Sequence, residues 1–394
     1  MDRIDFLKYT SLGGIGLGIM PSLLQSCSKE DDIDINFNGK VLIIGAGAAG
    51  MMTAYTLSQY NIDYTLIEAT TNYGGRVKKT DSFTDFPIDL GAEWIHDKPK
   101  VFGELINDEN VDGNIDLISY QPESIYFWNN NSLTETNLGS HFYREYKFKR
   151  TTWYDFFEDF IIPKIEANVT FDRVVESIDY NGDKVEVLTD EGQTFIADKV
   201  IVTVPIKVLQ SDMISFNPAL PSNIRQTIDE IYVPPGLKVF IEFSERFYPD
   251  LISVSSIAGV NGAEKTYYNA AFKKDSNKNI LALFQVGKEA SELTDLTNDE
   301  IIASVLAELD EMFDGKASST YVNHVVQNWV SEPHIQGAYT FLELSQYEGT
   351  SEISRGLNNK VYFAGEAYHQ QANATVHGAA FTGRDIAKTI IAGG

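Results

Sequence analysis

A glycine-rich turn near the start of the chain, between an apolar segment and a small-residue segment, constrains the fold more than any other feature. Residues 41–44 are apolar throughout, as a parallel strand buried on both faces requires. Gly45, Gly47 and Gly50 follow at once with the spacing Gly-x-Gly-x-x-Gly. The first glycine permits the tight turn, the second lets the backbone approach a pyrophosphate, and the third lets the next helix pack on the strand. The pattern predicts a strand–turn–helix unit whose helix N-terminus binds the phosphates of a dinucleotide.

The acidic residue that such a unit needs stands at the expected place. Residues 64–67 form a second strand-like run, and Glu68 ends it, 68 − 50 = 18 residues after Gly50. A carboxylate there can accept hydrogen bonds from both hydroxyls of an adenosine ribose, which favours a nucleotide without a 2′-phosphate. FAD and NAD both meet this condition. The Gly-Gly-Arg turn at residues 74–76 favours FAD, because it adds open backbone and a guanidinium for an extended dinucleotide.

The N-terminal residues are typical of an export signal followed by a tether. Arg3 and Lys8 precede an apolar, glycine-rich stretch, and small residues then lead to Cys27. This order predicts a secretory signal peptide over residues 1–26 rather than a transmembrane helix. The segment ending at Cys27 resembles a bacterial lipobox, which predicts lipidation of that cysteine, an acidic tether over 27–37, and an exported protein of the bacterial cell envelope or periplasm. A cleaved signal with a chance cysteine is the alternative, and the export route stays open.

Charge and cysteine content argue against several classes of function. The 394 residues include 31 basic and 56 acidic ones, a formal charge of −25, which argues against a nucleic-acid partner. One cysteine cannot build a disulfide framework or a thiolate metal site. The six histidines show none of the known ligand spacings, so we expect no metal. A lipid anchor at Cys27 is the one membrane contact that we expect.

Two further segments predict regular structure. Residues 185–204 alternate between apolar and polar and contain turn signals, which predicts a hairpin that leads into a buried strand at 200–204. Thr297 and Glu300 have the spacing of a capping box, and Gly315 is a helix stop signal, so an amphipathic helix is expected between them.

Seven segments, spread over nearly the whole chain after residue 38, are together similar to the flavin amine oxidase family, which includes monoamine, polyamine and L-amino-acid oxidases. The segments are VLIIGAGAAG, LIEATTNYGGRV, IDLGAEWIH, residues 171–205, PPGLKVFIEF, NWVSEPHIQGAYT and VYFAGEAYHQQANATVHGAAFTG. The resemblance implies an α/β fold in which a Rossmann-like FAD-binding domain of the GR2 type is interleaved with an α+β substrate domain. The FAD-binding domain is expected over 38–95, 166–210 and 345–394, and the substrate domain over 96–165 and 211–344.

The resemblance also implies roles for single residues. Those expected to contact the cofactor are Gly45, Gly47, Ala48, Ala49, Gly50, Glu68, Ala69, Gly74, Gly75, Arg76, Gly91, Ala92, Glu93, Trp94, Val175, Gly365, Glu366, Thr375 and Val376. Those expected to contact the substrate are Glu93, His96, Tyr339, Thr375 and His377. Lys238, Trp329 and Tyr339 are expected to be catalytic: the lysine holds a water at flavin N5, and the two aromatic side chains lie beside the flavin. For His377, a packing role at a helix start is an equal alternative.

The residues around Lys238 allow two interpretations on their own. Residues 236–243 alternate like a strand, so Lys238 shares a face with Phe240 and Glu242. A buried lysine in such a strand needs a partner or a water. An exposed lysine on an amphipathic strand is the alternative, and the family resemblance favours the functional role.

Three departures from the family pattern narrow the expected activity. Ala338 stands where monoamine oxidases carry the cysteine bound to the flavin, so non-covalent FAD is expected. Thr375 stands where a second tyrosine would complete the monoamine cage. Glu93 and Trp94 stand in the segment where L-amino-acid oxidases typically place an arginine for the substrate carboxylate, which favours amines and suggests that Glu93 faces a cationic amine.

The segment from Val361 to Ala387 is rich in glycine and alanine. Residues 361–364 are expected to form the last buried strand of the FAD sheet, and Gly365 and Glu366 to meet the ribityl chain. The small residues over 372–378 are expected to let the flavin rest on backbone, with the positive end of the next helix aimed at the ring.

The implied reaction is hydride transfer from an amine α-carbon to flavin N5, hydrolysis of the imine to an aldehyde, and reoxidation by O2 with release of H2O2. A quinone or another acceptor stays open. The alternatives are an L-amino-acid oxidase whose carboxylate arginine is Arg144 or Arg150, a flavin desaturase or porphyrinogen-oxidase-like enzyme, and a non-catalytic FAD-binding envelope protein.

Overall fold

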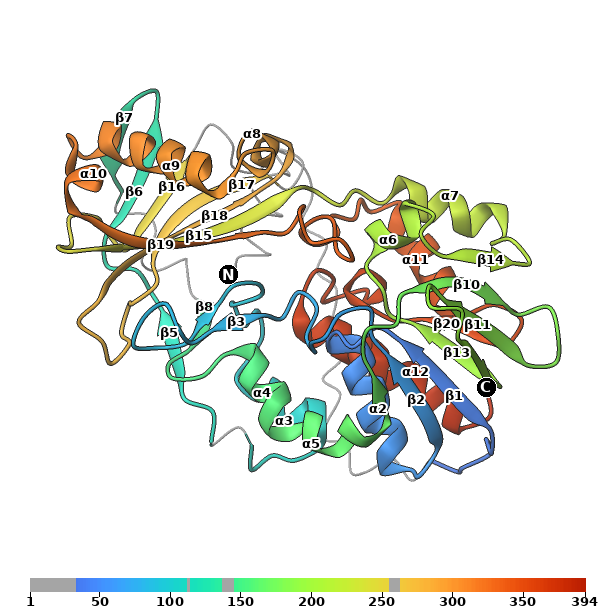
Figure 1. The fold of residues 1–394 in the computed structure, drawn as a ribbon. Helices are drawn as coiled ribbons and strands as arrows, with labels where there is room; N and C mark the ends of the chain where they lie inside the picture. Colours follow the sequence, from blue (N-terminus) through green and yellow to red (C-terminus); the bar gives the residue numbers. More distant parts are fainter. Residues whose placement is uncertain (1–32, 112–113, 137–144, 255–262) are drawn as a thin grey trace, which may run out of the picture.

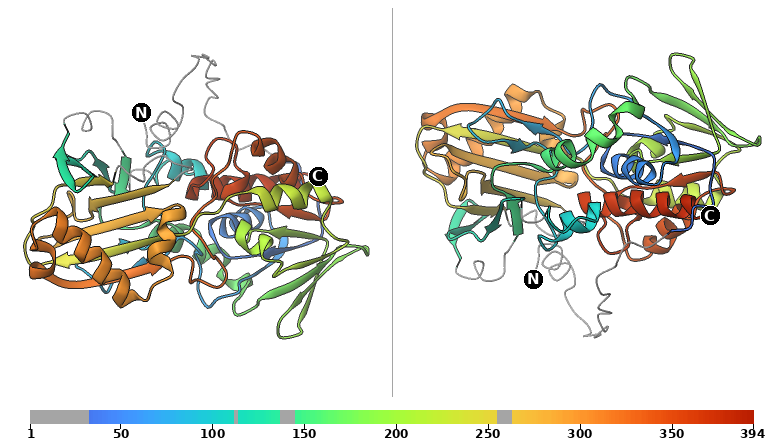
Figure 2. Two further views of the ribbon diagram at one scale, coloured as in Figure 1. Left: turned by 90° about the horizontal axis from the view of Figure 1, so that it is seen from above. Right: turned by 90° about the horizontal axis from the view of Figure 1, so that it is seen from below.

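The computed structural model describes residues 33–111, 114–136, 145–254 and 263–394. The predicted signal peptide, Cys27 and most of the predicted tether lie outside these ranges. Within them, no helix is both long and apolar enough to span a lipid bilayer. The chain forms two lobes that lie side by side in all three ribbon views (Figures 1 and 2).

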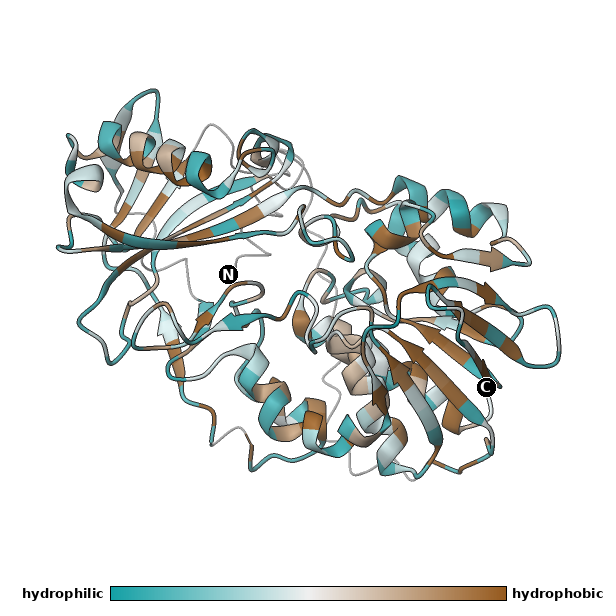
Figure 3. Cartoon of the chain, viewed as in Figure 1, coloured by the Kyte–Doolittle hydropathy of each residue, from teal (hydrophilic) through white to brown (hydrophobic). Residues whose placement is uncertain are grey.

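The first lobe, called here the Rossmann lobe, is built on a five-stranded parallel sheet (Figure 1, right). In spatial order its strands are β20 (Val361–Phe363), β13 (Lys199–Val202), β1 (Lys40–Ile44), β2 (Asp63–Ile67) and β9 (Val169–Thr170). Ile44 pairs with both Val202 and Ile67, so the carboxyl ends of the three central strands meet at one edge. These strands are mostly apolar after their first residues (Figure 3), because helices and a second sheet cover their two faces. The predicted α/β fold with a Rossmann-like domain is confirmed.

Helix α2 (Ala48–Gln59) follows the glycine turn and packs between β1 and α12 (Val376–Ile391), the long C-terminal helix (Figure 2, right). A Cβ on Gly50 would lie 1.9 Å from the Gly45 carbonyl oxygen, and a Cβ on Gly383 would lie 2.1 Å from that of Ala49. The glycines therefore let a helix touch a turn on one side and a second helix on the other. Backbone thus approaches backbone at both positions, with no room for a methyl group.

The small residues of the C-terminal segment serve two purposes. Ala374, Thr375, Val376 and Ala379 line the large cavity described below. A Cβ on Gly378, in contrast, would lie 1.9 Å from the Ala372 carbonyl oxygen. The expectation that a flavin explains the small residues over 372–378 is therefore incomplete, because part of the pattern comes from the chain packing on itself.

A four-stranded sheet covers the other face of the parallel sheet. Its order is β12 (Thr194–Ala197), β11 (Val185–Thr189), β10 (Val175–Asp179) and β14 (Ser215–Asn217), and it contains the predicted hairpin. Helices that adjoin this sheet and the same core are α6 (Ile206–Gln210), α7 (Ser222–Glu230) and α11 (Gln346–Ser354). Since β14 and the buried side chains of α7 belong to this core, the Rossmann lobe continues beyond the expected boundary at residue 210, to Ile231.

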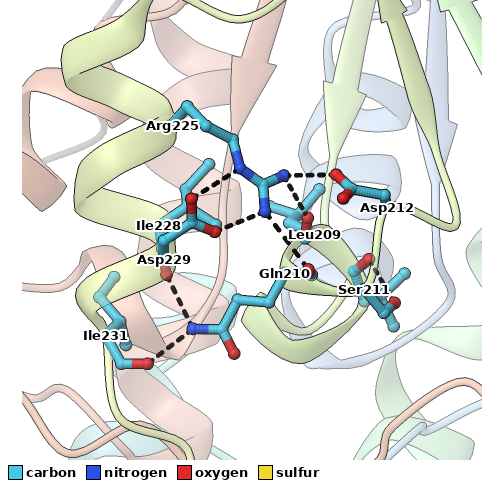
Figure 4. A network of polar contacts seen from close by, with 9 residues as sticks. Leu209, Gln210, Ser211, Asp212, Arg225, Ile228, Asp229 and Ile231 are labelled. Carbon is cyan, nitrogen blue, oxygen red and sulfur yellow. Dashed lines mark hydrogen bonds and ion pairs between the residues drawn. The ribbon is translucent and has the colours of Figure 1, made fainter.

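Arg225 ties α7 to α6 (Figure 4). Its guanidinium binds both oxygens of Asp229 and lies 2.7 Å from Asp212 Oδ1 and 2.9 Å from the Leu209 carbonyl oxygen. Gln210 Nε2 donates to the carbonyl oxygens of Ile228 and Ile231, at 2.8 and 2.7 Å. These hydrogen bonds hold the end of α6 against the end of α7.

The stretch expected to begin the substrate domain, residues 96–165, is shared between the lobes. Its helices α3 (Val101–Ile106), α4 (Trp153–Phe160) and α5 (Ile162–Ile165) bury aromatic and aliphatic side chains in the core around α2. Its strands β6 (Ile125–Asn129) and β7 (Ser132–Glu135) join the sheet of the second lobe. A boundary drawn at residue 96 therefore separates helices from the core that they complete.

The second lobe, called here the seven-stranded lobe, is an extended sheet covered on one side by helices (Figure 1, left). Beyond β6 and β7, its strands are β19 (Tyr321–Asn328), β15 (Gly236–Phe243), β18 (Asn279–Val286), β17 (Glu264–Asn269) and β16 (Leu251–Val254). Its covering helices are α8 (Ser291–Thr294), α9 (Asn298–Met312) and α10 (Lys316–Thr320). The predicted capping box of α9 is confirmed, since Thr297 and Glu300 bind each other's backbone N–H groups.

The remaining elements of the described chain are short. They are the pairs β3 (Lys79–Thr80) with β4 (Ile88–Asp89) and β5 (Leu117–Tyr120) with β8 (Glu145–Phe148), and the 3₁₀ turns η1 (Glu166–Asn168), η2 (Lys288–Ala290) and η3 (Glu366–Tyr368).

The contact between α2 and α12 can be tested by one methyl group. Gly383→Ala should lower the free energy of unfolding by about 1–3 kcal/mol, because the new Cβ collides with the Ala49 carbonyl oxygen. Chemical denaturation of the purified protein measures the change. Gly182→Ala is the matched control, since its Cβ would meet nothing closer than 3.7 Å. Equal unfolding midpoints for Gly383→Ala and the control would contradict the packing.

Candidate active site

A cavity of about 1080 Å³ lies between the lobes. One wall comes from the carboxyl ends of β1 and β2, with Ile44, Ile67 and the residues that follow them. The opposite wall comes from β15 and β18, with Lys238 and Phe284, and from Trp329. Pockets for drug-sized ligands occupy roughly 300–1,000 Å³, so this volume suits a dinucleotide together with a small substrate.

The turn before α2 forms one end of the cavity. Gly45 has a φ of +103°, and its N–H donates to the Ile67 carbonyl oxygen at 2.8 Å. Gly47 adopts extended backbone and precedes the free N–H groups of α2. A Cβ on Gly47 would meet no atom closer than the Gly74 carbonyl oxygen at 3.9 Å, so the protein itself does not require glycine there. The absence of a side chain at Gly47 instead leaves backbone open toward the cavity.

Glu68 lies beside this turn and lines the cavity, as the motif predicts. Its Oε2 accepts the Ala46 N–H at 2.7 Å, and its Oε1 accepts the N–H and the hydroxyl of Thr70, both at 2.9 Å. These bonds fix the direction of the carboxylate. Oε1 thus has two donors and Oε2 has one, so Oε2 can accept a further hydrogen bond.

Arg76 and Glu366 connect the first and last parts of the chain. Arg76 Nη1 lies 3.0 Å from Glu366 Oε1 and 2.7 Å from the Ala338 carbonyl oxygen. Glu366 Oε2 also accepts the Thr340 hydroxyl at 2.6 Å and the Ala374 N–H at 3.1 Å, and Oε1 accepts the Thr340 N–H at 3.2 Å. With four donors already on its carboxylate, Glu366 has little capacity left for a ribityl hydroxyl. Its observed contacts make it the partner that orients Arg76.

Thr375 caps α12 at the cavity wall. Its hydroxyl accepts the Gly378 N–H at 3.0 Å and donates to the Ala372 carbonyl oxygen at 2.7 Å. Thr375 and Val376 line the cavity, so the N-terminal end of α12, with its partial positive charge, lies against it.

A buried group of charges closes the other end of the cavity. Lys238 Nζ donates to Glu93 Oε2 at 2.6 Å and to the carbonyl oxygens of Asp89 and Gly91, each at 3.0 Å. Lys147 Nζ lies 2.5 Å from Glu93 Oε1, and the Tyr268 hydroxyl donates to Glu93 Oε2. Lys238 is 2% exposed, which rules out the alternative of an exposed lysine on an amphipathic strand.

The charges of this group are set by burial and by each other. Burial opposes ionisation of Glu93, but the ammonium groups of Lys147 and Lys238 outweigh it and hold the pKa of this carboxyl well below its usual range. Burial lowers the pKa of Lys238, and the Glu93 carboxylate counteracts that shift. Burial, reinforced by the negative charge of Glu93, raises the pKa of Asp89 well above its usual range. Glu93 is therefore an ionised carboxylate whose charge is already neutralised by two lysines.

The aromatic residues expected near a flavin lie at this same end. Trp329, Tyr339, Trp94 and Phe284 all line the cavity. The Trp329 ring packs so closely on Gly91 that a Cβ there would lie 2.9 Å from it. Trp94 packs edge-on against Tyr120, with ring centroids 5.1 Å apart.

Most of the residues expected at the site line the cavity. They are Gly45, Gly47, Ala48, Ala49, Glu68, Ala69, Gly74, Gly75, Arg76, Gly91, Ala92, Glu93, Trp94, His96, Val175, Lys238, Trp329, Tyr339, Gly365, Glu366, Thr375 and Val376. His96 Nδ1 lies 3.1 Å from Glu145 Oε2.

Two expected residues lie behind the wall. Gly50 packs against the Gly45 carbonyl group, as its motif position predicts. His377 is 3% exposed, and its Nε2 lies 3.3 Å from the Thr375 hydroxyl. Burial lowers the pKa of His377 to about 4, so the ring is neutral near pH 7. The position of His377 matches the alternative of a packing residue at a helix start.

The motifs did not reveal Lys147 and Tyr268. Lys147 is 2% exposed in β8, and Glu145, two residues earlier on the same face, is 1% exposed. Two charges at alternate positions of a short strand are a signal for buried ionic partners, but only the fold shows that the partners are Glu93 and His96.

Known proteins resemble this chain along most of its length. A family profile described as flavin containing amine oxidoreductase matches residues 156–391, more than half of the chain, and one described as NAD(P)-binding Rossmann-like domain matches residues 43–108. Polyamine oxidase 3 of Oryza sativa subsp. japonica is 24% identical over 426 residues, covering 87% of both chains. Lysine-specific histone demethylase 1B of Mus musculus is 24% identical over 438 residues, 90% of this chain and 53% of the relative. The chain thus spans about half the length of that demethylase.

The fold comparison agrees with the family profile. Wild-type putrescine oxidase bound to putrescine superposes with a TM-score of 0.73 at 17% identity, over 90% of this chain and 99% of that one. Together with the glycine turn, Glu68 and the cavity between the lobes, the profile match settles the relationship. The chain belongs to the family of flavin-containing amine oxidoreductases.

Proposed function

We propose that the protein is an FAD-dependent amine oxidoreductase that acts on a small, uncharged amine. This proposal rests on one continuous cavity, which runs from the turn before α2 to Lys238, Trp329 and Tyr339. Bound FAD would supply the chemistry, accepting a hydride from the α-carbon of the amine and passing the electrons to O2, with H2O2 as product, or to another acceptor. The imine product would hydrolyse to an aldehyde.

FAD fits the residues that line the cavity. The N–H groups of α2 and the open backbone at Gly47 and Gly75 suit a pyrophosphate, and Glu68 suits the adenosine ribose. Arg76, oriented by Glu366, adds a fixed positive charge. Ala338 offers no atom for a covalent link, so we propose that FAD is held without one.

The wall near Lys238 favours an uncharged amine. Trp94, Phe284, Trp329 and Tyr339 supply apolar and aromatic surface. Glu93 is expected from the sequence to face a cationic amine, but its two lysine partners leave it no free negative charge. The aromatic surface would therefore orient the neutral form of the substrate.

The contacts of the arginines argue against an amino-acid substrate. Arg150 is 68% exposed, lies 3.4 Å from Asp275 and does not line the cavity, and Arg144 lies outside the described residues. Arg76 and Arg173 line the cavity, and each has a carboxylate partner. No arginine of the described ranges is thus left in the cavity for a substrate carboxylate.

We also propose that the protein lies in the cell envelope and has a lipid anchor at Cys27, on the basis of its N-terminal sequence.

The role of the turn can be tested at Gly47. Gly47→Ala should weaken FAD binding at least about tenfold, because the methyl group would occupy the space through which the pyrophosphate approaches. Fluorescence titration of FAD-depleted protein with FAD measures the dissociation constant. The same variant should lose less than about 1 kcal/mol of unfolding free energy, since the added Cβ meets no close atom. An unchanged FAD affinity would contradict the assignment of the phosphate site.

The reaction itself can be tested by anaerobic bleaching of the flavin. Polyamines, aryl-alkyl amines and amino acids are mixed in turn with the purified protein, and the loss of flavin absorbance is followed. Primary amines should bleach it at low substrate concentration, at a rate that rises about tenfold per pH unit below the amine's own pKa, because the neutral form reacts. Amines without an α-hydrogen are the control and should leave the colour unchanged. Failure of every compound to bleach the flavin would exclude an amine oxidoreductase.

A further inference from the structure

We propose that Glu93 is a positioning residue that fixes the ammonium group of Lys238, so that Lys238 acts on a bound flavin through its charge and not through a held water. This inference rests on the proposed function, because that function places the flavin ring at the Lys238 end of the cavity. It differs from the role that the family resemblance implies for Lys238.

The geometry leaves Lys238 no free donor. An ammonium group has three N–H bonds. Lys238 Nζ donates to three protein acceptors, which are Glu93 Oε2 and the carbonyl oxygens of Asp89 and Gly91. A water on Nζ would have to replace one of these bonds. The lysine is therefore a fixed positive charge on the cavity wall.

Glu93 is itself held from its other side. Lys147 Nζ lies 2.5 Å from Glu93 Oε1, and it lies over three aromatic rings, 4.9 Å from the centroid of Trp94, 5.3 Å from Tyr120 and 4.9 Å from Tyr268. Such a cage of rings favours a cation. Because the Tyr268 hydroxyl also donates to Glu93, the carboxylate cannot turn away from Lys238.

The surrounding titratable groups leave this cluster with a net positive charge. Lys147 and Lys238 contribute two positive charges and Glu93 one negative charge, 2 − 1 = +1. Burial raises the pKa of Tyr268 above its usual value near 10, so its hydroxyl is neutral near pH 7. Burial, reinforced by the negative charge of Glu93, also raises the pKa of Asp89 and favours its protonated form. Lys274, whose pKa burial lowers to about 8, borders a second cavity of about 10 Å³ together with Asp89, Glu93 and Lys147. A cavity of that size has room for about one water.

A fixed charge in a water-poor site acts strongly on a neighbouring group that gains negative charge. At low dielectric it stabilises the charged product without having to reorient. The Lys238 charge would therefore favour the reduced, anionic form of a bound flavin. Glu93 keeps this charge in place, since a buried lysine without a carboxylate partner loses its proton readily.

The test compares Glu93→Gln with the wild-type holoprotein. The equilibrium constant for two-electron reduction of the bound FAD is measured against a reference dye at pH 6 and pH 9. Between pH 6 and pH 9, this constant should fall about tenfold further in Glu93→Gln than in wild type, because Lys238 of the variant loses its proton in this range. The additional fall corresponds to about 30 mV in the two-electron reduction potential. Adding Lys238→Met to Glu93→Gln should abolish the extra fall. An equal pH dependence in wild type and Glu93→Gln would overturn the proposal.

A matched control lies on β17, the strand that also contains Tyr268. Lys265 and Tyr267 of β17 bind Glu308 of α9, which gives a second Lys–Glu–Tyr group whose members do not line the cavity. Glu308→Gln should alter stability and leave the reduction constant unchanged at both pH values. If Glu93→Gln does not fold, Lys147→Met keeps Lys238 paired and lowers the cluster's net charge by one, so the reduction constant should fall about tenfold at both pH values. No change in Lys147→Met would also overturn the proposal.

A second readout separates this inference from the proposed function. With 13C-labelled lysine, the Cε resonance of Lys274 titrates in every variant, since its pKa is about 8. Glu93→Gln should show one additional Cε resonance that titrates between pH 6 and pH 9, and this additional resonance should be absent from wild type and from the double variant that also carries Lys238→Met. If no amine bleaches the flavin but this titration appears, the proposed function fails and the hold of Glu93 on Lys238 stands. If the titration appears and the reduction constants do not differ, the charge does not act on the flavin and the proposal is overturned.

Discussion

Close backbone contact on both sides of helix α2 is the constraint on which the rest of the structure depends. Gly50 brings the helix onto the turn at Gly45, and Gly383 brings the C-terminal helix onto Ala49. These contacts place the first N–H groups of α2 at the edge where the parallel strands end. They also fix α12, whose capped end lies against the same cavity. One packing arrangement thus sets both helix ends that a flavin dinucleotide would meet.

Charged contacts between distant segments complete the cavity. Arg76 and Glu366, 290 residues apart, join the glycine-rich turn to the C-terminal segment. Glu93 and Lys238 join the segment after β4 to the seven-stranded lobe. Buried ion pairs contribute little net stability on average, but loss of one partner leaves an uncompensated charge and is costly. Their placement here favours a role in holding the walls in position and in setting the potential inside the cavity.

Much of the fold could be predicted from local pattern. Neighbouring residues alone were enough to recognise the first strand, the glycine turn and the acidic residue Glu68. The same holds for the capping box at Thr297. The boundaries between the lobes were harder to predict from the sequence. The local sequences of α3, α4 and β14 are consistent with either lobe, and only the elements that they pack against decide to which lobe they belong. For the small residues of α12, the sequence could not distinguish contact with a cofactor from contact with another helix, since both require the same absence of side chain.

By itself, the sequence determined the class of the protein: a Rossmann-like unit and a set of motifs shared with flavin amine oxidoreductases. Only the tertiary structure decided the state of the charges. Glu93 could have faced a substrate cation, but Lys147, 54 residues away along the chain, occupies that position in space (147 − 93 = 54). The reason is physical: a motif encodes geometry over a few residues, whereas the charge and freedom of a buried group depend on every element packed around it.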